Sequence, residues 1–332
     1  MIRCATLLLL AASAHAEPIT LRLATAAPDG TAWARQLKQT SDGVTAGTNG
    51  AIKIKWYWGG IAGDEIETGA RMDKGQLDGV ASGGPLCDRI MPSMRVLGLP
   101  GLFQSRDEAA YAMHSLRATL TEEAQKAGFA LLITSGLGPT VVFSRNPIRS
   151  MAELRATKLW TWDLNEVEVQ SEKAMGLQVN VQPLLSAARS YSTNVVDGFI
   201  AVPAAALAFQ WSTQAHYLTD LRTRYLTACI VIPNRVFDKL PQAHQAVLRE
   251  EFAKGDARFE DLGRRMDEEL LGGLFGKQGM VSVPVSETFR SQFFESARQA
   301  REKLGGLVAQ PLIARVLQML VDYRAEHRTA AK

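Results

Sequence analysis

Predicted strands and helices alternate along the first part of this 332-residue chain, and this alternation limits the folds that it can adopt. A strand is predicted over 19–24, a helix over about 31–46, and a second strand over 52–58, where apolar and polar residues alternate with period two. A helix over about 65–74 and a short strand over about 78–81 follow. This β-α-β-α-β pattern is typical of a sheet with parallel neighbouring strands and covering helices.

The pattern begins again after a capping box formed by Ser150 and Glu153, so two α/β units are predicted in series. Beyond them, apolar residues at helical spacing lie among charged ones from Pro241 to about residue 271. Proline suits the first turn of a helix. We therefore predict a long helix here, with the length to cross from one unit to the other.

The N-terminus has the features of a secretory signal peptide. Arg3 supplies a positive charge, residues 4–12 are apolar, and Ala14-His15-Ala16 is a small-x-small cleavage signal. Cleavage is predicted after Ala16. The apolar run is shorter than the roughly 20 residues that span a bilayer, and Cys4 precedes it instead of following it as a lipoprotein cysteine would. We expect an exported, periplasmic chain with no stable membrane insertion.

Charge and cysteine content exclude some classes of protein. The net charge is +3 and is spread along the chain without a basic stripe, which argues against nucleic-acid binding. A chain of this length is expected to form about two domains. Cys87 and Cys229 follow the predicted cleavage point. An oxidising compartment would permit a disulfide between them, but buried free thiols are equally compatible with the sequence.

No pattern of catalytic or metal-binding residues is found. The later histidines are scattered without metal-ligand spacing, and no nucleophile elbow or zinc-protease motif is present. The glycine-rich segment 59–63 lacks phosphate-loop spacing, so we interpret it as a tight turn at the rim of a cleft. Asp163, Glu166 and Glu168 are interpreted as a solvated helix start. We expect no enzyme activity, no metal and no cofactor.

Aromatic residues give the strongest indication of a binding site. Trp160 and Trp162 are two apart on a predicted strand and therefore project from one face, and Trp211 follows Gln210 further along. Core packing is as frequent a role for a single tryptophan. Three indoles near predicted strand ends favour a pocket, since pockets are apolar with a few placed polar groups.

Almost the whole chain after the signal peptide resembles the substrate-binding component of tripartite ATP-independent periplasmic (TRAP) transporters, and the dicarboxylate-binding type is the most similar. Each matching segment is weakly specific by itself, but their order is distinctive. These segments are Leu21-Arg-Leu-Ala-Thr25, Gly59-Gly60 with Gly63-Asp64-Glu65, Met72-Asp-Lys-Gly-Gln-Leu-Asp78, Leu97-Gly-Leu-Pro-Gly-Leu-Phe103, Asn146-Pro-Ile-Arg-Ser150 with Glu153-Leu154, Lys158-Leu-Trp160, Met175-Gly176, and Val195-Val-Asp-Gly198 with Pro203.

The resemblance implies an α/β, two-lobed periplasmic binding protein fold with a hinge and a long helix spanning both lobes. After a signal peptide at 1–16, lobe I would comprise 17–140 and about 228–267, and lobe II 141–227 and about 268–328. The implied partners are a small-molecule ligand, held between the lobes, and the subunits of a TRAP-type membrane permease.

This chain departs from the family pattern at the expected carboxylate clamp. The family has an arginine where Trp160 stands, and a second arginine near Thr140. The pattern therefore looks like a subgroup that lacks the clamp, and we expect an uncharged or hydrophobic ligand, because a buried unpaired carboxylate would cost several kcal/mol. The predicted ligand-binding residues are Trp160, Trp162, Trp211, Gln210, Phe199, Phe143, Thr140, Asp163, Gly60 and Gly84.

Two alternatives remain open at this point. The chain could be a periplasmic carrier of lipid or hydrophobic molecules that works without an importer. It could also be a conventional TRAP component that binds an organic acid, with the clamp rebuilt from other residues such as Arg145 or Arg149.

Overall fold

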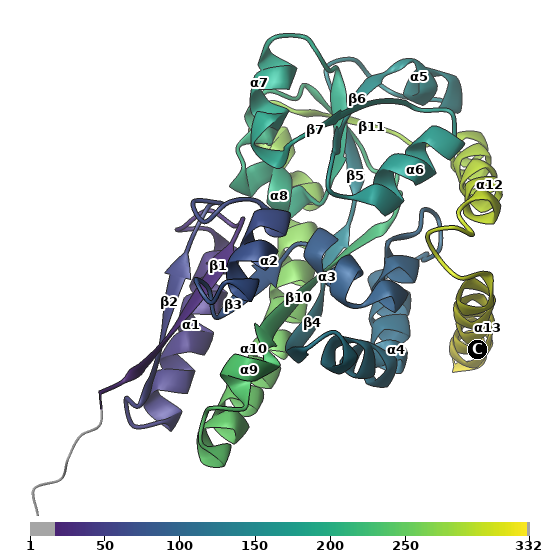
Figure 1. Cartoon of the computed structure of the whole chain (residues 1–332). Helices are drawn as coiled ribbons and strands as arrows, with labels where there is room; N and C mark the ends of the chain where they lie inside the picture. The colour runs from purple at the N-terminus through teal and green to yellow at the C-terminus, as the bar shows by residue number, and fades with distance from the viewer. Residues whose placement is uncertain (1–16, 331–332) are drawn as a thin grey trace, which may run out of the picture.

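The computed structural model of the chain describes residues 17–330, with side chains to residue 327 (Figure 1). The predicted signal peptide lies outside the described residues. The described chain forms two α/β lobes, each built on its own sheet. The predicted fold class, with two lobes and a long helix that spans them, is confirmed.

The sheet of the first lobe combines parallel and antiparallel strands. Its order is β2(Ile52–Tyr57)-β1(Ile19–Thr25)-β3(Gly79–Ser82)-β10(Tyr225–Pro233)-β4(Phe129–Pro139). The first three strands are parallel, as predicted, and β10 is antiparallel to both of its neighbours. Apolar residues alternate between the two faces. One face packs against α1 (Ala32–Gly47) and α10 (Gln242–Glu269), and the other against α2 (Glu65–Asp73), α3 (Pro85–Ile90), η1 (Pro92–Gly98) and α4 (Arg106–Lys126).

The sheet of the second lobe is built in a similar way. Its order is β11(Val281–Val283)-β9(Tyr217–Thr219)-β5(Val141–Ser144)-β8(Gly198–Ala201)-β6(Lys158–Trp162)-β7(Gln178–Gln182). Strand β6 is parallel to β7 and β8, and β5 is antiparallel to β8 and β9. The remaining elements here are α5 (Met151–Ala156), α6 (Glu166–Ala174), η2 (Leu184–Ser186), α7 (Ala187–Ser192), α8 (Pro203–Ala208), η3 (Trp211–Thr213), η4 (Leu270–Leu274), α11 (Phe275–Lys277) and α12 (Glu287–Lys303). The short helix α9 (Asn234–Phe237) packs against β10 and β4 of the first lobe.

The chain crosses between the sheets where β4 gives way to β5 and where it returns into β10. The two crossings lie side by side and are hydrogen-bonded to each other. The Thr140 N–H donates to the Arg224 carbonyl at 2.9 Å, and the Thr223 N–H donates to the Thr140 carbonyl at 3.0 Å. The two threonine hydroxyls are 2.6 Å apart and also bond. This paired crossing is the natural hinge between the lobes.

Helix α10 is the long helix predicted from Pro241, which forms its N-cap. It extends for 28 residues, packs against α1 and β4 in the first lobe, and reaches α8 in the second (Figure 1). It continues into a π-helical turn that contains Gly273 at φ 144°.

The final helix, α13 (Gln310–Ala330), packs against α4 and η1 of the first lobe. Its apolar residues, including Ile313, Val316 and Leu320, belong to the same core as those helices. The division predicted from the sequence assigns this segment to lobe II. The predicted division of the chain into lobe I and lobe II stays a prediction.

Cys87 of α3 and Cys229 of β10 form a disulfide, with their Cα atoms 5.9 Å apart. The sequence had left this pairing open. Both cysteines are almost fully buried. The bond therefore attaches α3 to β10, the strand between β3 and β4 in the sheet of the first lobe, across a sequence separation of 142 residues.

We predict that Cys87→Ala/Cys229→Ala lowers the free energy of unfolding by about 2–5 kcal/mol, because the crosslink restricts a long loop of the unfolded chain. Urea unfolding of the oxidised wild type and the variant measures this. The wild type unfolded in the presence of a thiol reductant should match the variant. Equal midpoints for variant and oxidised wild type would contradict the prediction.

Candidate functional site

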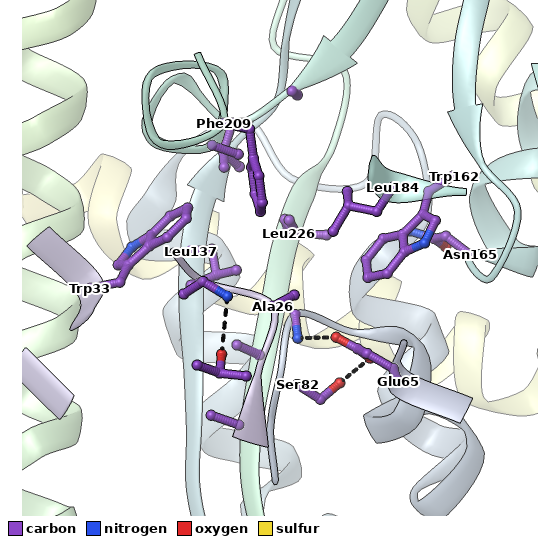
Figure 2. Close-up of a pocket in the computed structure, with 18 of the residues that line it drawn as sticks. Ala26, Trp33, Glu65, Ser82, Leu137, Trp162, Asn165, Leu184, Phe209 and Leu226 are labelled. Atoms are coloured by element: carbon purple, nitrogen blue, oxygen red, sulfur yellow. Dashed lines mark hydrogen bonds between the residues drawn. The ribbon is translucent and has the colours of Figure 1, made fainter. Parts of the chain in front are cut away.

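A cavity of about 150 Å³ lies between the lobes, and both lobes supply its walls. Aromatic side chains form much of the surface. Trp33 of α1 comes from the first lobe, while Trp160 and Trp162 of β6, Phe209 and Trp211 come from the second. Figure 2 shows Trp33, Trp162 and Phe209 approaching the cavity from three sides. The site is concave and mainly apolar, which are the ordinary properties of a small-molecule pocket.

Local backbone geometry places these rings. The period of two in β6 directs Trp160 and Trp162 to the same side of the sheet. Gln210 adopts a left-handed conformation at φ 59°, which turns the chain after α8 so that Trp211 packs back towards the strand. The ring centroids of Trp160 and Trp211 are 5.2 Å apart, and Phe209 stacks on Trp211 at 5.1 Å.

Two polar atoms of cavity-lining residues are buried without a hydrogen-bond partner in the described part of the chain. They are Ser135 Oγ, from β4 of the first lobe, and Trp160 Nε1, from the second. Buried polar groups are nearly always paired in folded proteins. These two atoms are therefore the groups that a bound molecule could satisfy by hydrogen bonding.

Glu65 lines the cavity, but its hydrogen-bonding capacity is used within the protein. Its carboxylate accepts the Ser82 hydroxyl at 2.5 Å and the Gly83 N–H at 2.6 Å (Figure 2). It also accepts the Leu86 N–H at 2.9 Å. Burial raises the pKa of Glu65, and the three donors oppose that rise. The side chain joins α2 to the start of α3 and holds the cavity floor in place.

Arg224 also lines the cavity and forms an ion pair with Glu168 of α6. The two side chains are only 8% and 6% exposed. Arg224 is the only arginine, lysine or histidine of the described chain that lines the cavity. The interpretation of Glu168 as part of a solvated turn is therefore wrong, since the helix turns it inward, whereas Asp163 and Glu166 are exposed.

Glu172 lies one helical turn beyond Glu168 and is also buried. Its carboxylate accepts the Thr161 hydroxyl at 2.6 Å. Burial, together with the charge of Glu168, raises the pKa of Glu172 to about 8, although Arg224 and Thr161 oppose the shift. At neutral pH Glu172 is mainly protonated, so the cluster carries one negative and one positive charge.

The structure brings four of the predicted site residues together at the cavity wall: Trp160, Trp162, Trp211 and Thr140. Thr140 is engaged at the hinge, where its hydroxyl bonds to that of Thr223.

The other six predicted residues lie away from the wall. Phe143 and Phe199 stack on each other at 4.9 Å in the core behind it. Asp163 and Gln210 are exposed. Gly60 and Gly84 occupy turns at φ 75° and 138°, conformations that favour glycine.

The residues that the sequence did not indicate include Trp33, Glu65, Glu168 and Arg224. Trp33 is an ordinary apolar position near the start of a helix. Arg224 and Glu168 are 56 residues apart, and only the folded hinge brings them together. Arg145 and Arg149, considered as a rebuilt clamp, lie elsewhere: Arg145 covers the Tyr191 ring at 4.5 Å and Arg149 is exposed.

Over residues 17–330, no group of three or more His, Cys, Asp or Glu side chains could hold a metal ion. Among the same residues, no helix is both long and apolar enough to cross a membrane.

Comparison with known proteins relates the chain to one family. The model described as "Bacterial extracellular solute-binding protein, family 7" matches residues 23–305. Several solved structures share the fold. The sugar acid binding protein of Advenella mimigardefordensis, in complex with galactonate, has a TM-score of 0.85 at 18% identity, covering 92% of this chain and 98% of that one.

Two further structures are similar. A TRAP periplasmic solute binding protein of Haemophilus influenzae with bound L-gulonate has a TM-score of 0.83 at 17% identity, covering 91% of this chain and 99% of its own. An extracytoplasmic solute receptor of Bordetella pertussis that binds pyroglutamic acid has a TM-score of 0.83 at 18% identity, covering 90% and 99%. At these identities the likeness shows the fold.

The raised pKa of Glu172 predicts a pH dependence of stability. Between its ordinary value of 4.5 and about 8, the folded protein keeps a proton that the unfolded chain has released. The contribution of protonated Glu172 to the free energy of unfolding is therefore complete below about pH 4.5 and is lost as the pH rises through about 8. From pH 6 to 8, we expect the unfolding free energy of the wild type to fall by about 2 kcal/mol more than that of Glu172→Gln.

Urea unfolding at several pH values measures this difference. Glu166→Gln is the matched control, because Glu166 is exposed on the same helix and the variant should follow the wild type. Parallel curves for the wild type and Glu172→Gln would show that Glu172 does not hold the proton.

Proposed function

Because the chain belongs to family 7 of the bacterial extracellular solute-binding proteins, the binding components of TRAP transporters, we propose that it captures a small, largely apolar solute without a carboxylate and delivers it to a TRAP-type permease. Members of this family bind solutes and are not enzymes. The proposal places the chain in the periplasm, after cleavage of the signal peptide following Ala16.

The observation that carries the ligand class is the aromatic wall. Trp33, Trp160, Trp162 and Trp211 line one small cavity, and most of the remaining lining residues are aliphatic. Aromatic faces contribute large contact areas to a bound ring or aliphatic body. A carboxylate buried against them without a partner would cost several kcal/mol. The Ser135 hydroxyl and the Trp160 indole N–H would orient a polar atom of the solute.

The size of the cavity also supports a small ligand. A volume of about 150 Å³ is similar to that of an apolar cavity that binds benzene. Because ligand contacts would come from both lobes, a bound solute favours the closed arrangement over an open one. The paired crossing at Thr140 and Thr223 is the connection about which the lobes would turn in such a closure.

One alternative has specific support. The solved structures named above contain galactonate, L-gulonate or pyroglutamic acid, and Arg224 lies at the cavity wall of this chain. An organic acid would then be recognised by Arg224 after rearrangement of its pairing with Glu168.

Identification of the native ligand decides between these candidates. The protein is purified from its native host and denatured, and the released small molecules are identified by mass spectrometry. A neutral compound at near-stoichiometric yield supports the proposal. An organic acid at the same yield overturns the ligand class and leaves the solute-binding function in place.

Trp162→Ala is predicted to weaken binding of the native ligand at least tenfold, since it removes one aromatic face from the cavity wall. Ligand occupancy after purification, followed by calorimetric titration with the identified compound, measures the loss. Trp56→Ala is the matched control, because Trp56 packs in the first lobe outside the cavity and should leave affinity unchanged. Equal affinities for the wild type and Trp162→Ala would remove Trp162 from the binding site.

A further inference from the structure

Arg224 and Glu168 reach the cavity from different elements. Arg224 directly precedes β10 at the hinge, and Glu168 lies in the first turn of α6. Both line the cavity, and both are more than nine-tenths buried. A buried guanidinium requires an anionic partner, and Glu168 supplies it.

Other carboxylates lie near Arg224, but Glu168 is the one that pairs with it. Glu172 bonds to the Thr161 hydroxyl and is mainly protonated at neutral pH. Glu65 is held by Ser82, Gly83 and Leu86. Asp88 lies near Glu65, Arg95 and Arg224, and burial raises its pKa to about 7. Of these groups, Glu168 has the ion-pair contact with the guanidinium.

We infer that Glu168 occupies the position at Arg224 that a carboxylate of the solute would otherwise take, and thereby makes the cavity selective against carboxylate-bearing solutes. This inference rests on the proposed function and names the residue that determines its specificity. An arginine and a carboxylate form the strong, geometrically specific contact by which a bound organic acid is recognised.

The cavity discriminates against solute carboxylates because Glu168 is covalently part of the protein and a solute is not. The Glu168 carboxylate is tethered beside Arg224, so its effective concentration there far exceeds that of a dissolved solute. A solute carboxylate would have to displace it, and Glu168 would then remain buried without a partner, which is strongly unfavourable. A neutral solute makes no such demand, because the pair stays intact while the aromatic wall binds the apolar body.

The test removes the Glu168 carboxylate by mutation and adds a small carboxylate in solution to take its place. Propionate has the three-carbon skeleton of the whole glutamate side chain, of which Glu168→Ala keeps only Cβ, and propionamide is its neutral counterpart. We expect propionate to bind Glu168→Ala at least tenfold more tightly than it binds the wild type in calorimetric titrations. It should also raise the melting temperature of the variant at millimolar concentration, whereas propionamide should not.

Three further variants make the result specific. Glu168→Ser also removes the carboxylate and opens the place beside Arg224, so it provides the same titration if Glu168→Ala folds poorly. Glu166→Ala removes an exposed carboxylate from the same helix and should behave as the wild type. Glu168→Ala/Arg224→Ala lacks the cation, and propionate should have no effect on it.

Several outcomes overturn the inference. These are equal propionate affinity in the wild type and Glu168→Ala, no propionate binding to Glu168→Ala or Glu168→Ser, or binding that persists without Arg224. They leave the proposed function standing as long as the native ligand is neutral. An organic acid recovered from the wild type would instead overturn the proposed ligand class itself.

Discussion

The antiparallel pairing of β4 with β10 governs the arrangement of the rest of the molecule. These strands form the longest ladder of the first sheet, and their ends carry the chain into and out of the second lobe. The Thr140 and Thr223 hydrogen bonds join the two crossings where the ladder stops. Because Arg224 lies directly at this junction, the pairing that builds the hinge also sets the only described cation of the cavity wall in place.

Around that junction, the protein satisfies its buried charges internally. Glu65 accepts three hydrogen bonds next to the start of α3, and the disulfide anchors the same helix to β10. Arg224 is neutralised by Glu168. The outcome is a cavity whose charged groups are occupied and whose accessible wall is mainly aromatic and aliphatic. Charged residues in a pocket therefore do not by themselves indicate a charged ligand.

Local patterns in the sequence were sufficient for much of the fold. Alternation over 52–58 predicted β2, Pro241 marked the start of α10, and the pair Trp160 and Trp162 indicated one face of the cavity. Contacts between distant segments were not accessible in this way. Glu168 had the local appearance of a solvated helix start, and its partner Arg224 lies 56 residues away, immediately before β10. The sequence also did not show whether Cys87 and Cys229 form a disulfide, because no spacing rule pairs cysteines 142 positions apart.

The C-terminal segment has a mechanical consequence. Helix α12 packs against α5 and α6 of the second lobe, whereas α13 packs against α4 and η1 of the first. Only residues 304–309 connect them, and two of these, Leu304 and Val308, are buried in the core of the first lobe. Six fully extended residues span about 20 Å. The contour length of this short tether, located away from the hinge, therefore sets an upper limit on the amplitude of any rotation of one lobe against the other.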